Sequence, residues 1–106
     1  MTIKKLIERI FKKDPLDSIL NELFEGGDGT SFENAVIIKA KTTSEGISKE
    51  YMFISMFYGN RDKDWELIMQ SLQEHNNKSF DVIEIKLKNG EVKEVFFDIT
   101  NFFGKF

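Results

Sequence analysis

Two runs of alternating apolar and polar residues near the C-terminus constrain the fold of this chain most. They cover residues 83–87 and 95–99 and are separated by Asn89-Gly90. A period of two is typical of half-buried strands, and an Asn-Gly pair between two such runs is typical of a hairpin. The sequence therefore predicts a β-hairpin with one apolar face, formed by Ile83, Ile85, Leu87, Val95, Phe97 and Ile99.

The length of the connection decides the register of this hairpin. A two-residue loop would place Ile85 opposite Glu94, which puts a carboxylate on the apolar face. A three-residue connection with Gly90 in a bulge would keep the six apolar side chains together. We predict the bulged turn, and a structure with Ile85 directly opposite Glu94 would contradict it.

Length and composition limit the class of protein. A chain of 106 residues is about one domain, and 41% hydrophobic residues with a net charge of −3 are typical of a folded chain. The absence of cysteine excludes disulfides and zinc-thiolate sites. The N-terminus lacks the apolar core of a signal peptide, and no apolar run approaches the roughly 18–20 residues that span a bilayer. We expect a cytoplasmic, single-domain protein.

The first 13 residues differ in charge from the rest of the chain. Apolar residues between Ile3 and Phe11 follow the spacing of one helical stripe, which predicts an amphipathic helix over residues 1–13. Five cations and one glutamate give this segment a charge of +4, so residues 14–106 carry −7. The residues of this basic helix that we expect to contact a partner are Lys4, Lys5, Arg9, Phe11, Lys12 and Lys13.

A second helix is predicted from Asp14, as a cap before Pro15, to Gly26. The segment "AVIIKAK" predicts a buried strand at residues 35–41. Residues 47–58 fit either a helix or a strand, but a strand would place Lys49 and Ser55 among its apolar positions. We predict a helix, because Ile47, Tyr51, Ile54 and Tyr58 share a helical face.

Residues 65–74 fit two patterns. They match a helix capped by Asp64, or a strand that turns at Asn76-Asn77 into the predicted hairpin. We predict the strand. The fold class is then α+β, with N-terminal helices and an antiparallel sheet of about four strands that carries helices on one face. Phe102, Phe103 and Phe106 are too apolar for a free tail, so we expect them to fold back across a sheet face or edge.

The run Gly26-Gly27-Asp28-Gly29-Thr30 resembles the nucleotide-contacting loop of the diacylglycerol- and lipid-kinase families. In those families the glycines bring backbone amides close to phosphates at the end of a buried strand. Here the preceding residues are predicted as an amphipathic helix, so no residue's role is carried over from the family. We predict a turn, with Thr30 and Glu33 as a capping box and Phe32 as the anchor of the loop.

Other site patterns are sparse, and no cofactor is predicted. His75 is the single histidine and lies in a polar stretch, where an exposed turn residue is expected. Asp62, Asp64 and Glu66 could gather a divalent cation, but such runs are usually solvated. The acidic body argues against nucleic acid, because that binding depends on neutralising phosphates.

Two functional hypotheses follow. The first is a small non-catalytic protein-interaction module, adaptor-like or immunity-like, that binds another protein through its basic helix or its acidic, aromatic-rich body, including Trp65, Phe102 and Phe103. Self-association is also compatible with the stripe, and binding to a membrane surface would be weak and sensitive to salt. The second is a small-molecule-binding or hydrolase-like protein with an apolar pocket between helix and sheet. Its lining would be Tyr51, Phe53, Trp65 and Phe97, with Asp64, His75 or Asp98 as polar groups.

Overall fold

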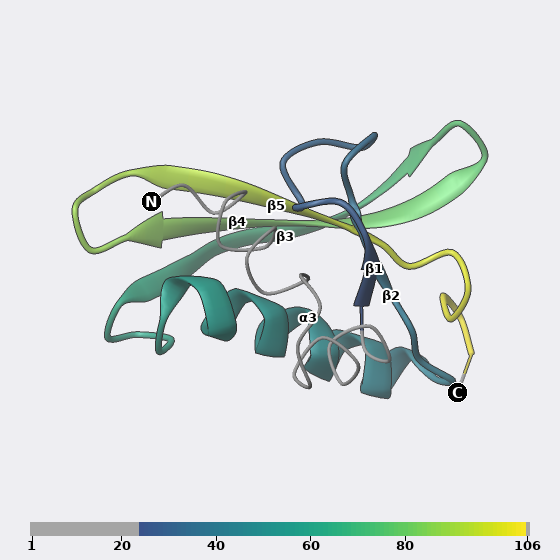
Figure 1. The fold of residues 1–106 in the computed structure, drawn as a ribbon, viewed down its shortest axis with the longest axis horizontal. Helices are drawn as coiled ribbons and strands as arrows, with labels where there is room; N and C mark the ends of the chain where they lie inside the picture. The colour runs from purple at the N-terminus through teal and green to yellow at the C-terminus, as the bar shows by residue number, and fades with distance from the viewer. Residues whose placement is uncertain (1–23, 106) are drawn as a thin grey trace, which may run out of the picture.

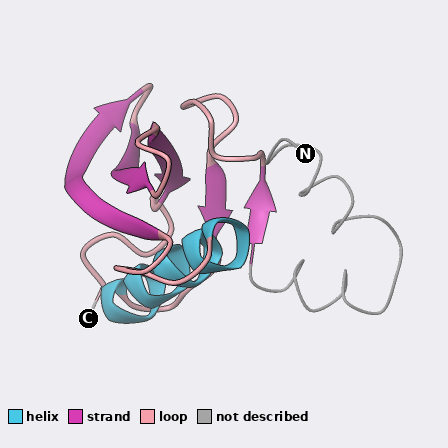
Figure 2. Ribbon diagram, turned by 90° about the vertical axis from the view of Figure 1, so that its left-hand side faces the viewer, coloured by secondary structure: helices cyan, strands magenta, loops and turns pink. Residues whose placement is uncertain are grey.

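A computed structural model describes residues 24–105 of the chain. These residues form a five-stranded sheet in the order β1-β2-β5-β4-β3, and helix α3 lies against one face of it (Figure 1, Figure 2). The fold is therefore α+β, as predicted. The elements are β1 (Phe24–Gly26), β2 (Val36–Ile38), α3 (Thr43–Tyr58), β3 (Trp65–His75), β4 (Lys78–Leu87) and β5 (Val92–Asp98).

The sheet is mixed, which corrects the expected antiparallel sheet of about four strands. β2 and β5 pair in parallel, with Val36 opposite Phe97, whereas the other neighbours are antiparallel. Parallel neighbours need a long connection, and α3, β3 and β4 provide it. The fifth strand is β1, which pairs with β2 at the far edge.

The expected N-terminal helices over residues 1–13 and 14–25 fall almost entirely in residues 1–23, outside the described part. In the described part α3 is the one helix, so the prediction of several helices packed on the sheet is not met there. Phe24 was expected at the end of a helix but belongs to β1. Phe24 lies opposite Ile38, is 1% exposed, and its ring contacts the Phe53 ring edge-on with 5.4 Å between centroids. Packing in the core therefore decides the conformation of this residue, although its spacing in the sequence fits a helix.

The bulged turn between β4 and β5 is confirmed. Ile85 lies opposite Lys93, and Glu94 lies opposite Glu84 on the other face of the sheet. The Gly90 amide donates to the Leu87 carbonyl at 2.9 Å, and the Leu87 amide donates to the Glu91 carbonyl at 2.7 Å. Gly90 has φ +92°, the left-handed conformation that this bulge requires.

Replacing Gly90 by alanine is expected to lower the free energy of unfolding by about 1 kcal/mol, because a residue with a β-carbon is disfavoured at positive φ. A β-carbon at this position would meet no atom within 4 Å, so the cost is conformational rather than steric. Denaturant unfolding measures it. Gly90→Asn is the control and should lose less, since asparagine tolerates this conformation. Equal stability of the alanine variant and the unmodified protein would contradict the bulged turn.

Each face of the sheet carries a packed element. On one face α3 packs against the predicted apolar set, and the rings of Phe53 and Phe97 meet edge-on at 5.6 Å. On the other face the loop between β1 and β2 lies over Phe80 and Phe96, whose rings are 5.0 and 4.9 Å from that of Phe32. The prediction that Phe32 anchors this loop is confirmed.

The glycine-rich run is the hairpin connection between β1 and β2. The Gly27 amide donates to the Ala35 carbonyl and the Gly29 amide to the Asn34 carbonyl, at 3.0 and 2.7 Å. These loop amides are therefore used within the hairpin. The expected capping box is absent from it, because Thr30 donates to Asp28 and Ser31 accepts from the Asn34 amide.

The two ambiguous segments resolve as predicted, into a helix and a strand. α3 begins four residues before the predicted boundary, where the Thr42 hydroxyl accepts from the Glu45 amide. β3 departs from strict alternation because the register shifts between Leu67 and Met69, which leaves Ile68 as an extra, bulged residue. That bulge explains why its periodicity was ambiguous.

Of the three C-terminal phenylalanines, Phe102 folds back into the hydrophobic core, as expected for an apolar tail. Phe102 is 1% exposed and packs on Gly46 near the start of α3. The Thr43 amide donates to the Lys105 carbonyl at 2.7 Å, which holds the tail against the helix. Phe103 is 46% exposed, and Phe106 lies outside the described residues. Over residues 24–105 we find no helix with the length and apolarity needed to cross a bilayer.

Candidate functional site

Strand β3 forms one edge of the sheet. It has 11 residues, and β4 is its single neighbour among the described strands. An edge strand presents a row of backbone N–H and C=O groups that can pair with another chain. Its exposed large apolar side chains are Ile68, Met69 and Leu72, at 46%, 55% and 51% exposure.

The charges along β3 have one sign. Glu66 and Glu74 are both exposed, and the sequence has no lysine or arginine between Lys63 and Lys78. Glu66 lies opposite Lys86 and Glu74 opposite Ser79, so the two carboxylates are seven positions apart along β4. An odd separation places them on opposite faces of the sheet.

A buried carboxyl pair lies behind this edge, between α3 and the sheet. Glu50 is 0% exposed and Asp81 of β4 is 7% exposed. Neither oxygen of Glu50 accepts a hydrogen bond from a donor in residues 24–105. A buried carboxylate with no donor beside it is costly, so burial favours the form of Glu50 that carries a proton.

Glu50 carries that proton. Burial, together with the hydrogen bond to Asp81 and its charge, raises the pKa of Glu50 from 4.5 to about 10. Glu50 is therefore neutral at pH 7.

A chain of polar contacts leads from this pair to β3. The Gln70 amide donates to Asp81 Oδ2 at 3.4 Å, and the Tyr51 hydroxyl donates to Gln70 Oε1 at 2.7 Å. The Arg61 guanidinium lies 5.2 Å from the centre of the Tyr51 ring. Burial also raises the pKa of Tyr51, so its hydroxyl remains a donor. Gln70, in the middle of the edge strand, is thus held in place by the core.

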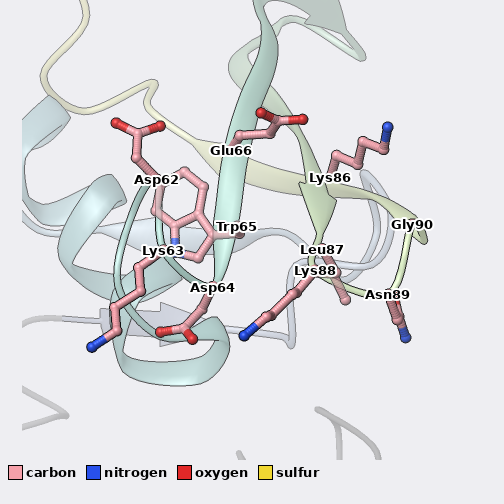
Figure 3. A pocket seen from close by; sticks show the side chains of 10 residues that line it. All are labelled: Asp62, Lys63, Asp64, Trp65, Glu66, Lys86, Leu87, Lys88, Asn89 and Gly90. Carbon is pink, nitrogen blue, oxygen red and sulfur yellow. The ribbon is translucent and has the colours of Figure 1, made fainter.

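An open hollow of about 610 Å³ lies at the start of β3 (Figure 3). Its wall carries both signs of charge, with Asp62 and Asp64 before β3 and Lys86 and Lys88 from β4 and its turn. Asp64 accepts a hydrogen bond from the Asn60 amide at 2.7 Å and so helps to form the turn before β3. Because the hollow is open and its charges are mixed, we assign it to the solvent-exposed surface beside the edge strand.

His75 lies at the other end of β3, where a smaller hollow of about 180 Å³ is found. Its ring stacks on Phe32 at 4.3 Å, and its Nε2 is 4.0 Å from Glu33. His75 is therefore a packing residue that holds the loop on the sheet, and it is less exposed than expected for a turn histidine.

The structure separates the residues that were predicted to contact a partner. Trp65 and Phe102 are 2% and 1% exposed, and the Trp65 indole N–H donates to the Gly59 carbonyl at 2.8 Å, so both rings serve the core. Phe103 is exposed. The six predicted residues between Lys4 and Lys13 lie outside the described part. The exposed edge of β3 was not predicted, because strand order cannot be obtained from local pattern.

The residues proposed for an apolar pocket do not converge on one site. Phe53, Trp65 and Phe97 are fully packed in the core, with Tyr51 at its margin. Asp64 serves the turn before β3, whereas Asp98 accepts from the Thr100 hydroxyl at 2.7 Å. The carboxyl with a raised pKa is Glu50, which was missed. Glu50 lies three residues after Ile47 and four before Ile54, which places it on the predicted apolar face of the helix. A carboxyl on that face is a sequence signal that could have identified Glu50 as buried.

Residues 24–105 contain no cluster of three histidine, aspartate or glutamate side chains that could hold a metal ion, so Asp62, Asp64 and Glu66 do not form one. Comparisons with protein-family models, with curated protein sequences and with solved structures gave no match to this chain.

Proposed function

We propose that this protein is a non-catalytic interaction module that binds an extended segment of another protein along the edge of β3. The observation that carries the proposal is an 11-residue edge strand with Ile68, Met69 and Leu72 exposed. In this mode of recognition backbone hydrogen bonds supply affinity and exposed side chains supply specificity. The acidic strand favours a segment that carries cations.

The core supports this role of β3. Gln70 is tied to Asp81 and Tyr51, and Trp65 is tied to Gly59, so the strand is held at both its centre and its start. A preformed edge loses little conformational entropy when a partner pairs with it. The basic helix remains a prediction for residues 1–13, and we propose its cations as a second point of contact.

Introducing charge on this edge is expected to abolish partner capture. The double variant Ile68→Lys, Leu72→Lys places lysines on the edge strand, a device that blocks strand addition. The control Met52→Lys, Met56→Lys changes two methionines of α3 that are also exposed, each at 43%. Proteins bound from a lysate of the source organism by the unmodified chain should be lost with the β3 variant and kept with the α3 variant.

Hydrogen exchange then locates the contact. Amides of residues 65–75 should exchange more slowly when a captured partner is bound, because a paired edge amide is protected. Partners that are captured equally by both variants, or that protect residues outside β3, would contradict the proposal.

A further inference from the structure

We infer that the segment bound at β3 is an extended stretch of another protein that carries two cationic side chains on opposite faces, about seven positions apart, with apolar residues between them. This inference rests on the proposed function and specifies its partner. It follows from the positions of the charged and apolar side chains along one edge.

The spacing comes from the register of β3. Glu66 and Glu74 mark the two ends of the exposed strand and lie on opposite faces, because the bulge at Ile68 changes their separation from eight residues to seven ladder positions. A strand paired with β3 places one side chain beside each ladder position. Its cations must therefore also differ by an odd number of positions.

The side chains between the two carboxylates determine the centre of the segment. Met69 and Leu72 are about half exposed, and they lie opposite Glu84 and Asp81, so they too occupy opposite faces. A bound segment covers both by presenting an apolar side chain on each face. Gln70 lies between them, with its amide oxygen and nitrogen already bonded to Tyr51 and Asp81.

The negative charge of β3 favours pairing with a cationic segment of another protein over pairing with a second copy of β3. Antiparallel pairing of two β3 strands would bring Glu66 and Glu74 of both copies to one edge on which neither strand has a lysine or arginine, so their like charges would repel. A cationic segment replaces this repulsion with two ion pairs at the exposed edge.

The test uses three synthetic peptides of identical composition and the full, isotopically labelled chain. The first peptide has lysines seven positions apart with valine and isoleucine between them, the second has them eight positions apart, and the third has both lysines at one end. Titration followed by amide chemical shifts measures binding at residues 65–75. The first peptide should bind about 2- to 30-fold more tightly than the others, the range expected for two exposed ion pairs, and its advantage should shrink at high salt.

Charge exchange provides the matched control. The variant Glu66→Lys, Glu74→Lys should lose the preference for the first peptide and prefer the same sequence with glutamates in place of the lysines. If all three peptides shift β3 amides with equal affinity, edge binding stands and the inferred charge pattern is wrong. If no peptide shifts them, the inference is overturned, and lysate capture with the Ile68 and Leu72 variants still decides the proposed function. Concentration-dependent dimerisation through β3 would overturn the choice of another protein as the source.

Discussion

Replacing Glu50 by glutamine is expected to raise the free energy of unfolding at pH 7, and the gain is expected to grow as the pH rises from 5 to 9. Glu50 is fully buried beside Asp81, and its pKa is about 10 in the folded chain against 4.5 for a free side chain. Between those values the folded state binds a proton that the unfolded state has released. The folded state therefore becomes less favourable as the pH rises.

The sign follows from the direction of the shift. A carboxyl group whose pKa is raised on folding contributes its full stability below the unfolded value of 4.5, and that contribution is lost as the pH approaches 10. The limiting slope for one proton is about 1.4 kcal/mol per pH unit. Glutamine has the same shape, cannot ionise, and offers an amide donor to Asp81. The free energy of unfolding of the variant should therefore not fall with rising pH on account of residue 50.

The measurement is denaturant unfolding of both chains at several pH values. Glu45→Gln is the control on the same helix, because hydrogen bonds from Lys49 and from the Lys41 amide lower the pKa of Glu45. The stability that ionised Glu45 contributes is present at neutral pH and is lost as the pH falls. Glu45→Gln should therefore lower the free energy of unfolding at neutral pH, whereas Glu50→Gln should raise it. Parallel pH profiles for the unmodified chain and Glu50→Gln would show that Glu50 is not held neutral by burial.

Replacing Gly46 by alanine is expected to destabilise the fold, although alanine is normally the better helix former by about 1 kcal/mol. A β-carbon at residue 46 would overlap Cε2 and Cζ of the Phe102 ring. That ring is 1% exposed and belongs to the core, so it has little room to move. We expect a net loss of about 1–3 kcal/mol, the usual cost of overpacking a core.

A double-mutant cycle separates the clash from other effects. Phe102→Ala alone should cost about 3–5 kcal/mol, because it removes a buried ring. In that background Gly46→Ala should be neutral or stabilising, since the atoms that it would overlap are gone. Ser55→Ala, at an exposed position of the same helix, should change stability little. Additive costs in the cycle would show that Phe102 does not pack on Gly46.

The elements that could be predicted from sequence are those whose signal is local. The β4–β5 hairpin, its bulged turn at Gly90 and the helix around residues 47–58 follow from side-chain periods and turn chemistry within a few residues. β3 was correctly predicted as a strand because of the turn that follows it, even though its bulge at Ile68 disturbed the alternation.

The predictions that failed depended on contacts between distant segments. Phe24 continued a helical stripe, yet it pairs opposite Ile38 in β1. Trp65 and Phe102 were chosen as contact residues because they are large and aromatic, and the core takes up both of them. The candidate site was missed for the same reason. Whether β3 lies at an edge depends on whether a strand distant in the sequence pairs with its free side, and pairing between distant strands has no local sequence signal.

The sequence by itself determined the α+β class, one hydrophobic core, the hairpin register and the acidic character of residues 65–75, because local spacing and composition specify these properties. Only the tertiary structure decided the parallel pairing of β2 with β5, the burial of Glu50 against Asp81 and the docking of Phe102 on Gly46. Each of these joins residues that lie far apart along the chain. The free energy of such a contact depends on how much surface both partners bury together, which neither segment's own pattern contains.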